Sequence, residues 1–140
     1  MSPSWIDDYV GLPFQEHGRD RSGLDCWGLV RLVLAERFAV QVPSFGEVYE
    51  RVSDRETIAK LVQAERLAWT AIVLGRERSG DVALLRLRGA PMHVGLVVAP
   101  PLMLHVERGI GSALASYRGL RWRSRLLGFY RHPALCVKAA

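Results

Sequence analysis

The chain has 140 residues, of which 49% are hydrophobic and 24% are charged, and its formal net charge is +5. This composition excludes wholesale disorder and predicts one globular domain over residues 1–140. No apolar run is long enough to span a bilayer, and the first residues lack the basic and apolar regions of a secretory signal. Two cysteines, Cys26 and Cys136, do not make a disulfide framework, so we expect synthesis in a reducing cytoplasm without a signal peptide.

The first half of the chain favours helices. Residues 4–10 fit a short helix or turn, and residues 11–24 are rich in glycine and charge, which predicts a loop. Residues 25–39 predict a helix, because apolar residues recur at helical spacing behind Asp25, a suitable N-cap. Residues 54–67 predict a second helix.

From residue 70 onward short runs typical of β-strands take over. We expect strands at 70–74, 81–87, 92–99, 102–107 and 125–131. Helices followed by strands predict an α+β domain, with N-terminal helices packed on a central antiparallel β-sheet. Alternating βαβ order and a Gly-rich phosphate loop are both absent, which argues against a nucleotide-binding sheet.

The cations are nearly all arginine, and several lie in the stretch YRGLRWRSRLLGFYR, interleaved with aromatic residues. Such a cluster occurs in some nucleic-acid binders. The same alternation also describes an amphipathic strand whose outer face is solvated. We favour the strand and expect no nucleic-acid partner.

Cys26 lies at the predicted start of the first helix, where unpaired backbone N–H groups and the helix dipole stabilise a thiolate. It shares a helical face with Leu29, Val30 and Val33, so its side chain is expected to point toward the sheet. Taken alone, such a cysteine is more often an inert core residue than a nucleophile. A nucleophile in this place needs a base on the sheet.

Two histidines are candidates for that base. The segment PMHVGLVVAPPLMLHVE predicts a hairpin, and a turn centred on Ala99 would place His93 directly opposite His105. A register change of two residues would leave them on the same face as diagonal neighbours. One imidazole can act as a base toward Cys26 while the other orients the first. A zinc site of Cys26, His93 and His105 is an alternative, but it lacks the paired close ligands of structural zinc sites, and we expect neither metal nor cofactor.

Four segments, taken in order over residues 9–131, resemble the NlpC/P60 family of cysteine peptidases. GLDCWGLVRLV resembles the segment around the family's nucleophile, SGDVALL its Gly-Asp-Leu turn, HVGLVV its His-Val-Gly-Ile segment, and LMLHV the strand with its third catalytic residue. The resemblance implies a papain-like α+β fold with the nucleophile at a helix N-terminus. It also implies hydrolysis of peptidoglycan peptides, with Cys26 as nucleophile, His93 as base and His105 as the orienting residue.

Two positions depart from the family pattern. Relatives usually have serine after the nucleophile, where this chain has Trp27, and many have a tyrosine where this chain has Phe14. Tyr9 could supply the missing hydroxyl if the loop folds back. Together with Asp25 and the backbone N–H of Cys26, these residues are the candidates for oxyanion and substrate binding.

The segments GLPF and DCWGLVR look most like the branch of the family found in phage tail-assembly proteins and gene transfer agents. This likeness implies phage-like tail or tail-tip proteins as partners and action in the periplasm or cell wall after incorporation in a tail. Two alternatives stay open: a tail-tip structural module with the fold but little activity, and a related amidase or acyltransferase.

Overall fold

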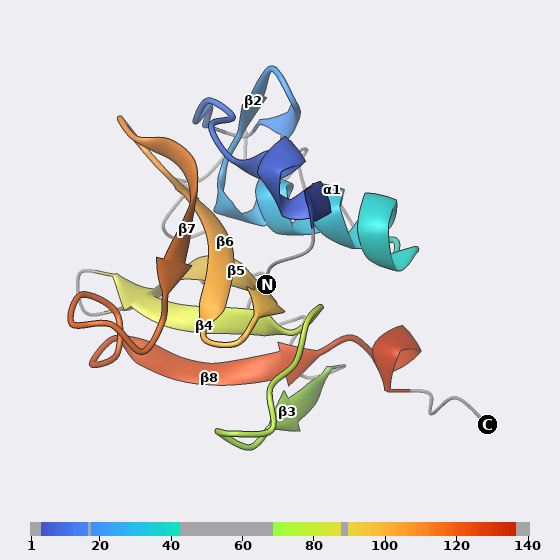
Figure 1. The fold of residues 1–140 in the computed structure, drawn as a ribbon, viewed down its shortest axis with the longest axis vertical. Helices are drawn as coiled ribbons and strands as arrows, with labels where there is room; N and C mark the ends of the chain where they lie inside the picture. Colours follow the sequence, from blue (N-terminus) through green and yellow to red (C-terminus); the bar gives the residue numbers. More distant parts are fainter. Residues whose placement is uncertain (1–3, 17, 43–68, 88–89, 137–140) are drawn as a thin grey trace.

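The computed structural model describes residues 4–16, 18–42, 69–87 and 90–136. The predicted helix at 54–67 and His17 lie outside the described residues. Figure 1 shows the N-terminal segment and its helix on one side of a curved sheet, with the chain's last strand on the opposite side.

The N-terminal part builds a small layer of its own. The 3-10 helix η1 (Ser4–Tyr9) leads to strands β1 (Arg19–Asp20) and β2 (Gly23–Leu24), which pair with each other, and then to helix α1 (Cys26–Phe38). A short 3-10 helix, η2 (Pro133–Leu135), follows the last strand. Within the described ranges, no helix is long and apolar enough to cross a membrane.

The main sheet has six strands in the order β3-β8-β4-β5-β6-β7, and every neighbouring pair is antiparallel. Its strands are β3 (Thr70–Ile72), β4 (Val82–Leu87), β5 (Ala90–Ala99), β6 (Leu102–Glu107), β7 (Gly111–Ser116) and β8 (Leu126–Arg131). This arrangement confirms the α+β prediction with a central antiparallel sheet. Strand β7 was not predicted, because GSALAS has small residues and no β-branched or aromatic ones.

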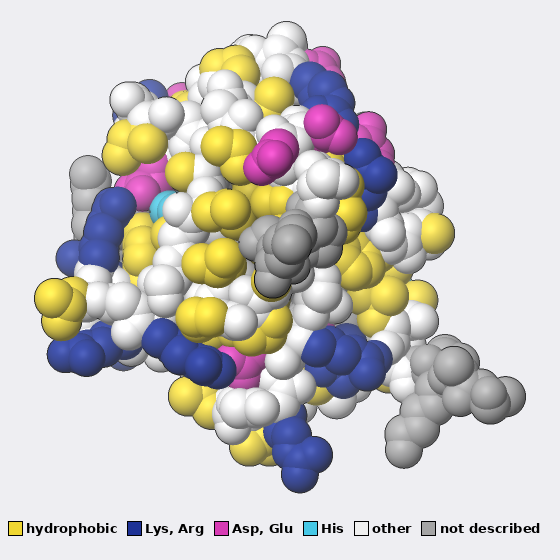
Figure 2. Space-filling view, in the orientation of Figure 1, with side chains coloured by type: hydrophobic (Ala, Val, Ile, Leu, Met, Phe, Trp, Pro, Cys, Tyr) yellow, Lys and Arg dark blue, Asp and Glu magenta, His cyan; other side chains and the backbone are white. Residues whose placement is uncertain are grey.

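The arginine-rich segment corrects one prediction. Residues 117–125 form turns, and the strand begins only at Leu126. Three of its arginines pair with carboxylates: Arg118 with Glu77, Arg121 with Glu107, and Arg131 with Asp81. In the view of Figure 2, arginine side chains lie along the left and lower parts of the molecule.

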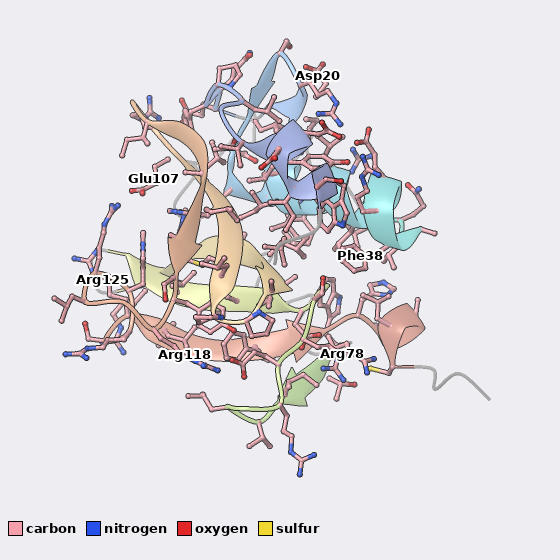
Figure 3. The ribbon with its side chains drawn as sticks, in the orientation of Figure 1. Asp20, Phe38, Arg78, Glu107, Arg118 and Arg125 are labelled. Carbon is pink, nitrogen blue, oxygen red and sulfur yellow. The ribbon has the colours of Figure 1, made fainter. Side chains whose placement is uncertain are left out.

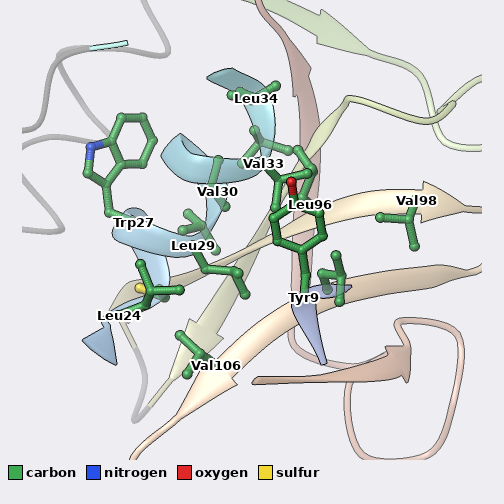
Figure 4. Close-up of a cluster of buried hydrophobic side chains, with 14 of the residues drawn as sticks. Tyr9, Leu24, Trp27, Leu29, Val30, Val33, Leu34, Leu96, Val98 and Val106 are labelled. Carbon is green, nitrogen blue, oxygen red and sulfur yellow. The ribbon is translucent and has the colours of Figure 1, made fainter. Parts of the chain in front are cut away.

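The two faces of the sheet have separate cores, as the alternation of side chains along a strand requires. On one face the apolar side of α1 packs on the even-numbered residues of β5, including Val94, Leu96 and Val98 (Figure 4). The other face buries a second group made by Ala83, Leu85, Val97, Met103, Tyr117, Trp122 and Phe129. His93 lies four residues before Val97 on β5. Because this spacing is even, its side chain belongs to the same face as Val97, away from α1.

Strands β5 and β6 pair only near their turn. Among the described residues their pairing runs from Ala99 with Leu102 to Leu96 with Leu104. Beyond that point β5 continues along β4, β6 continues along β7, and β6 and β7 curve away from the sheet (Figure 1). The register is shifted by two residues from a turn centred on Ala99. The directly opposite pairing of the two histidines was therefore wrong, and the diagonal alternative is correct.

Candidate active site

Asp25 starts α1 as its N-cap, as predicted. Its Oδ1 accepts hydrogen bonds from the Gly28 backbone N–H at 2.7 Å and from Arg19 Nη1 at 2.7 Å. Asp25 is 2% exposed, so this ion pair is held in the interior. The loop before the helix is thereby tied to the first turn of α1, and Cys26 becomes the first residue of the helix.

Glycine at position 28 lets this turn pack tightly. A Cβ on Gly28 would lie 2.1 Å from the carbonyl oxygen of Gly18, in the loop that precedes β1. Any side chain there would push the first turn away from that loop. Gly28, two positions after Cys26, therefore sets how closely the first turn of α1 packs on the loop at Gly18, and with it the position of Cys26.

The Cys26 thiol is enclosed, with 5% of the residue exposed. The backbone N–H groups of Val94 and Trp27 lie close enough to the sulfur to favour its anionic form. Burial, followed by the nearby charge of Asp25, raises the pKa of the Cys26 thiol to about 12. The resting sulfur is therefore protonated at neutral pH, and its contact with Val94 places it against β5 one residue from His93.

His93 and His105 meet where β5 and β6 diverge. Nε2 of His93 lies 3.0 Å from Nδ1 of His105, and each residue is 4% exposed. Burial is the main cause that lowers the pKa of His93, to about 3, with further contributions from His105 and Arg121. Burial also lowers the pKa of His105, against the opposing effect of Glu107. At neutral pH both rings are neutral, and one donates the hydrogen bond that the other accepts.

A neutral His93 with its proton on Nε2 would donate to Nδ1 of His105 and leave its own Nδ1 free to take a proton. This is the polarity that a base requires when a second group orients it. A thiol at a helix start, an oriented imidazole and a second imidazole are the parts of a nucleophilic acyl-transfer site. The sequence profile of the NlpC/P60 family matches residues 11–131, which include all three residues.

The chain belongs to the NlpC/P60 family. The family consists of cysteine peptidases and hydrolases that act on peptidoglycan. Over 118 residues the chain is 25% identical to the murein DD-endopeptidase MepS/murein LD-carboxypeptidase of Escherichia coli K12, covering 84% of this chain and 54% of that protein. It therefore spans about half the length of the curated relatives that it matches.

Solved structures of the family share the fold. The NlpC/P60 domain of the peptidoglycan hydrolase SagA superposes with a TM-score of 0.60 at 20% identity, covering 89% of this chain and 90% of that one. An NlpC/P60 protein of Bacillus cereus ATCC 10987 gives a TM-score of 0.68 at 14% identity, covering 94% of this chain and 41% of that one.

The other predicted site residues of this NlpC/P60 domain lie in different places. The Tyr9 hydroxyl donates to Glu36 Oε1 at 2.6 Å, ten residues along α1 from Cys26, which is about 15 Å along the helix axis. The structure therefore does not bring that hydroxyl to the cysteine. Phe14 forms a bridge with Leu24, two residues before Cys26, and the Arg108 guanidinium lies 5.0 Å from its ring centre.

Trp27 is 5% exposed and belongs to the core around α1, on the side of the helix away from Tyr9 in Figure 4. Asp25 acts on the helix start through its cap and its ion pair with Arg19. Within the described part of the chain no three His, Cys, Asp or Glu side chains form a group that could hold a metal, so the zinc alternative has no structural support there.

Sequence reasoning missed Trp122. Its ring stacks on His93 at 5.3 Å between ring centres and 13° between planes, and it meets His105 edge to face at 5.2 Å. The aromatic residues of the arginine-rich stretch were the available signal, but they were assigned to a strand.

Proposed function

We propose that this domain is a cysteine endopeptidase that cleaves the peptide stems of peptidoglycan, with Cys26 as nucleophile, His93 as base and His105 as the residue that orients His93. The observation that carries the proposal is the 3.0 Å contact between the two imidazoles, one of which, His93, is the neighbour in β5 of Val94, whose N–H lies near the Cys26 thiol. Family membership and the similarity to a murein endopeptidase supply the substrate class.

The chemistry would begin from a neutral thiol and a neutral imidazole. As the sulfur of Cys26 attacks the amide carbonyl, its proton passes to Nδ1 of His93, while the His93 Nε2–H bond to His105 stabilises the cation. His93 then protonates the leaving nitrogen and the C–N bond breaks, which leaves a thioester. Water attacks the thioester, gives one proton to His93 and releases the acid, and His93 returns that proton to the sulfur.

The backbone N–H of Cys26 would stabilise the negative oxygen formed during the attack. Two following N–H groups of the first turn already have acceptors: Gly28 donates to Asp25 Oδ1 and Leu29 to the Asp25 carbonyl. These bonds hold the turn that carries the N–H of the nucleophile.

The decisive experiment incubates purified protein with peptidoglycan stem peptides and identifies products by mass spectrometry. We expect new amino termini from the wild type, none from Cys26→Ala, and wild-type cleavage from Cys136→Ala. Cys136 is the matched control, because its sulfur contacts Thr70 and the Arg131 carbonyl. Cleavage that survives Cys26→Ala would overturn the mechanism. Release of ammonia or acyl transfer instead of a new amino terminus would indicate the amidase or acyltransferase alternative.

The burial of Cys26 favours a second candidate, a structural module with the peptidase fold and little activity. Phe14 also supports it, because the hydroxyl that many relatives have at this position is missing. Peptides and sacculi left intact by a protein with native thermal unfolding would favour this candidate over the endopeptidase.

We further propose that the domain works as part of a phage or phage-like tail, made in the bacterial cytoplasm and delivered to the cell wall by the particle. The sequence likeness of GLPF and DCWGLVR to the tail-assembly branch supports this. Gradient-purified tail particles probed with an antibody to the domain would test it. The domain should sediment with the particles, and its recovery only in the soluble fraction would overturn the assignment.

A further inference from the structure

Five side chains from three parts of the fold, the two histidines among them, form a closed ring of contacts. From β6, Glu107 Oε1 lies 3.9 Å from His105 Nδ1 and accepts a hydrogen bond from Arg121 Nη1 at 2.8 Å. The Arg121 guanidinium lies 4.5 Å from the ring centre of Trp122. Trp122 stacks on His93, and His93 contacts His105 at 3.0 Å. Each member is thus held by two neighbours in the ring.

Arg121 and Trp122 come from the turns between β7 and β8, not from the elements that carry the proposed catalytic residues. Figure 3 shows Glu107 on the curved part of the sheet and Arg125 on this turn segment, both on the same side of the molecule. Trp122 is only 2% exposed, whereas the side chain of Arg121 is 54% exposed. The segment therefore presents an indole inward and a guanidinium outward.

From this geometry we propose that Arg121 and Trp122 are positioning residues that cover the histidine pair, fix the plane of His93 and keep both imidazoles neutral. The role in catalysis rests on the proposed peptidase function, but the geometry and the protonation of the rings do not. Neither residue is placed to contact a reacting atom.

The physical argument has two parts. A flat indole stacked on His93 removes water from one whole face of the imidazole, which penalises the charged ring and strengthens its hydrogen bond to His105. It also restricts rotation of His93, so its Nδ1 keeps one direction. Arg121 adds a like charge that disfavours protonation of either ring, and Glu107 partly neutralises it.

The charged and titratable groups around His93 come from several elements. His105 and Glu107 belong to β6, Arg121 to the turn segment, and Cys26 to the start of α1. Arg125 lies on the Trp122 ring at 5.8 Å. Asp25 and Arg19 form a neutral pair at the helix start. Arg121 lowers the pKa of His105 and Glu107 raises it. Variants of the two residues should therefore shift the His105 titration in opposite directions.

The test follows the histidine side-chain NMR signals against pH in the full chain without substrate. For Trp122→Leu we expect the His93 titration to move upward by about one pH unit or more, with a smaller shift for Trp122→Phe, which keeps a flat ring. Trp69→Leu is the matched control, because Trp69 is also buried and packs its ring against His132, at 5.1 Å. It should leave His93 unchanged.

The second part of the test changes charge without removing an apolar side chain from the core. Arg121→Gln should raise the titration of both histidines, Glu107→Gln should lower that of His105, and Arg123→Gln, an exposed control two residues along, should do neither. Unchanged titration in Trp122→Leu, Trp122→Phe and Arg121→Gln would overturn the proposal, whether or not the protein cleaves peptidoglycan.

If the protein is active, a kinetic readout separates positioning from binding. Trp122→Phe should lower kcat by about tenfold with little change in KM, and the acid limb of the pH profile should move upward. A change confined to KM would overturn the positioning role. No cleavage by the wild type would count against the peptidase function alone, because the NMR result stands independently.

Discussion

His93 Nε2 and His105 Nδ1 lie 3.0 Å apart although the two residues are not paired across β5 and β6. Both residues lie beyond Leu96 and Leu104, where the pairing of the two strands ends. Cys26, at the start of α1, lies near the backbone N–H of Val94 in β5. Cys26 packs on one face of the sheet beside Val94, and the preceding residue of that strand, His93, belongs to the other face.

The first prediction concerns acid stability. The pKa of His93 is about 3 in the folded chain against an ordinary 6.5, so below pH 6.5 the unfolded chain binds a proton that the folded chain does not. The free energy of unfolding should therefore fall as the pH drops from 6.5 toward 3, and His93 should account for at least about 1 kcal/mol of this loss. Urea unfolding of the wild type and His93→Gln at several pH values measures it. Equal slopes in the two proteins would contradict the prediction.

A second prediction concerns thiol reactivity. Because Cys26 is buried and its pKa is raised to about 12, it should react slowly with iodoacetamide at pH 7 in the absence of substrate. Cys136 is partly exposed and should be modified first. Peptide mass spectrometry after timed labelling gives both rates in one sample. Faster labelling of Cys26 would show that the resting site holds a thiolate stabilised by an imidazolium.

The sequence was sufficient for most of the fold because its signals are local. Asp25 caps α1 as predicted, and the apolar positions behind it are those that the helix buries. The strands at 81–87, 92–99 and 102–107 follow from runs of β-branched and apolar residues, and they are found within two residues of their predicted ends. Strand β7 was not predicted, because its small residues give no run of β-branched or large apolar side chains.

The sequence was sufficient to select the candidate site residues, but not to predict how the two histidines meet. Same-face placement of His93 and His105 follows from the period of two in the expected register and in any register shifted from it by two residues. The two rings come into contact beyond the point where β6 stops pairing with β5, while β6 continues to pair with β7. No local sequence pattern predicts where that pairing ends. Trp122 reaches them from the turns at 117–125, so its role depends on the path of a loop.

A third prediction tests the ion pair at the helix start. Arg19 and Asp25 have side chains 14% and 3% exposed, so Arg19→Met would leave a buried carboxylate without its cation. We expect a loss of about 3 kcal/mol in the free energy of unfolding. The control is Arg21→Met, which removes an ion pair with Glu36 whose side chains are 44% and 41% exposed, and which should cost less than about 1 kcal/mol. Similar losses in the two variants, measured by urea unfolding, would argue against a special role for the interior pair.

The last prediction concerns Gly28. An added Cβ would meet the Gly18 carbonyl oxygen at 2.1 Å, a backbone atom, and the Asp25 carboxylate that caps the helix at 3.1 Å. Gly28→Ala should therefore displace the first turn of α1 and cost about 1–3 kcal/mol of stability, although alanine is the better helix former. Gly128→Ala is the matched control, because its Cβ would meet only the Tyr130 side chain, at 3.7 Å or more.

Because the close packing at Gly28 positions the first turn of α1, which carries Cys26, displacement of this turn in Gly28→Ala should also expose the thiol. Iodoacetamide should then modify Cys26 faster than in the wild type, while Cys136 keeps its rate. Labelling by mass spectrometry and urea unfolding on the same samples separate this local displacement from general unfolding, which would accelerate both cysteines. A stable Gly28→Ala protein with wild-type labelling at Cys26 would show that the loop at Gly18 yields and that this contact does not position the nucleophile.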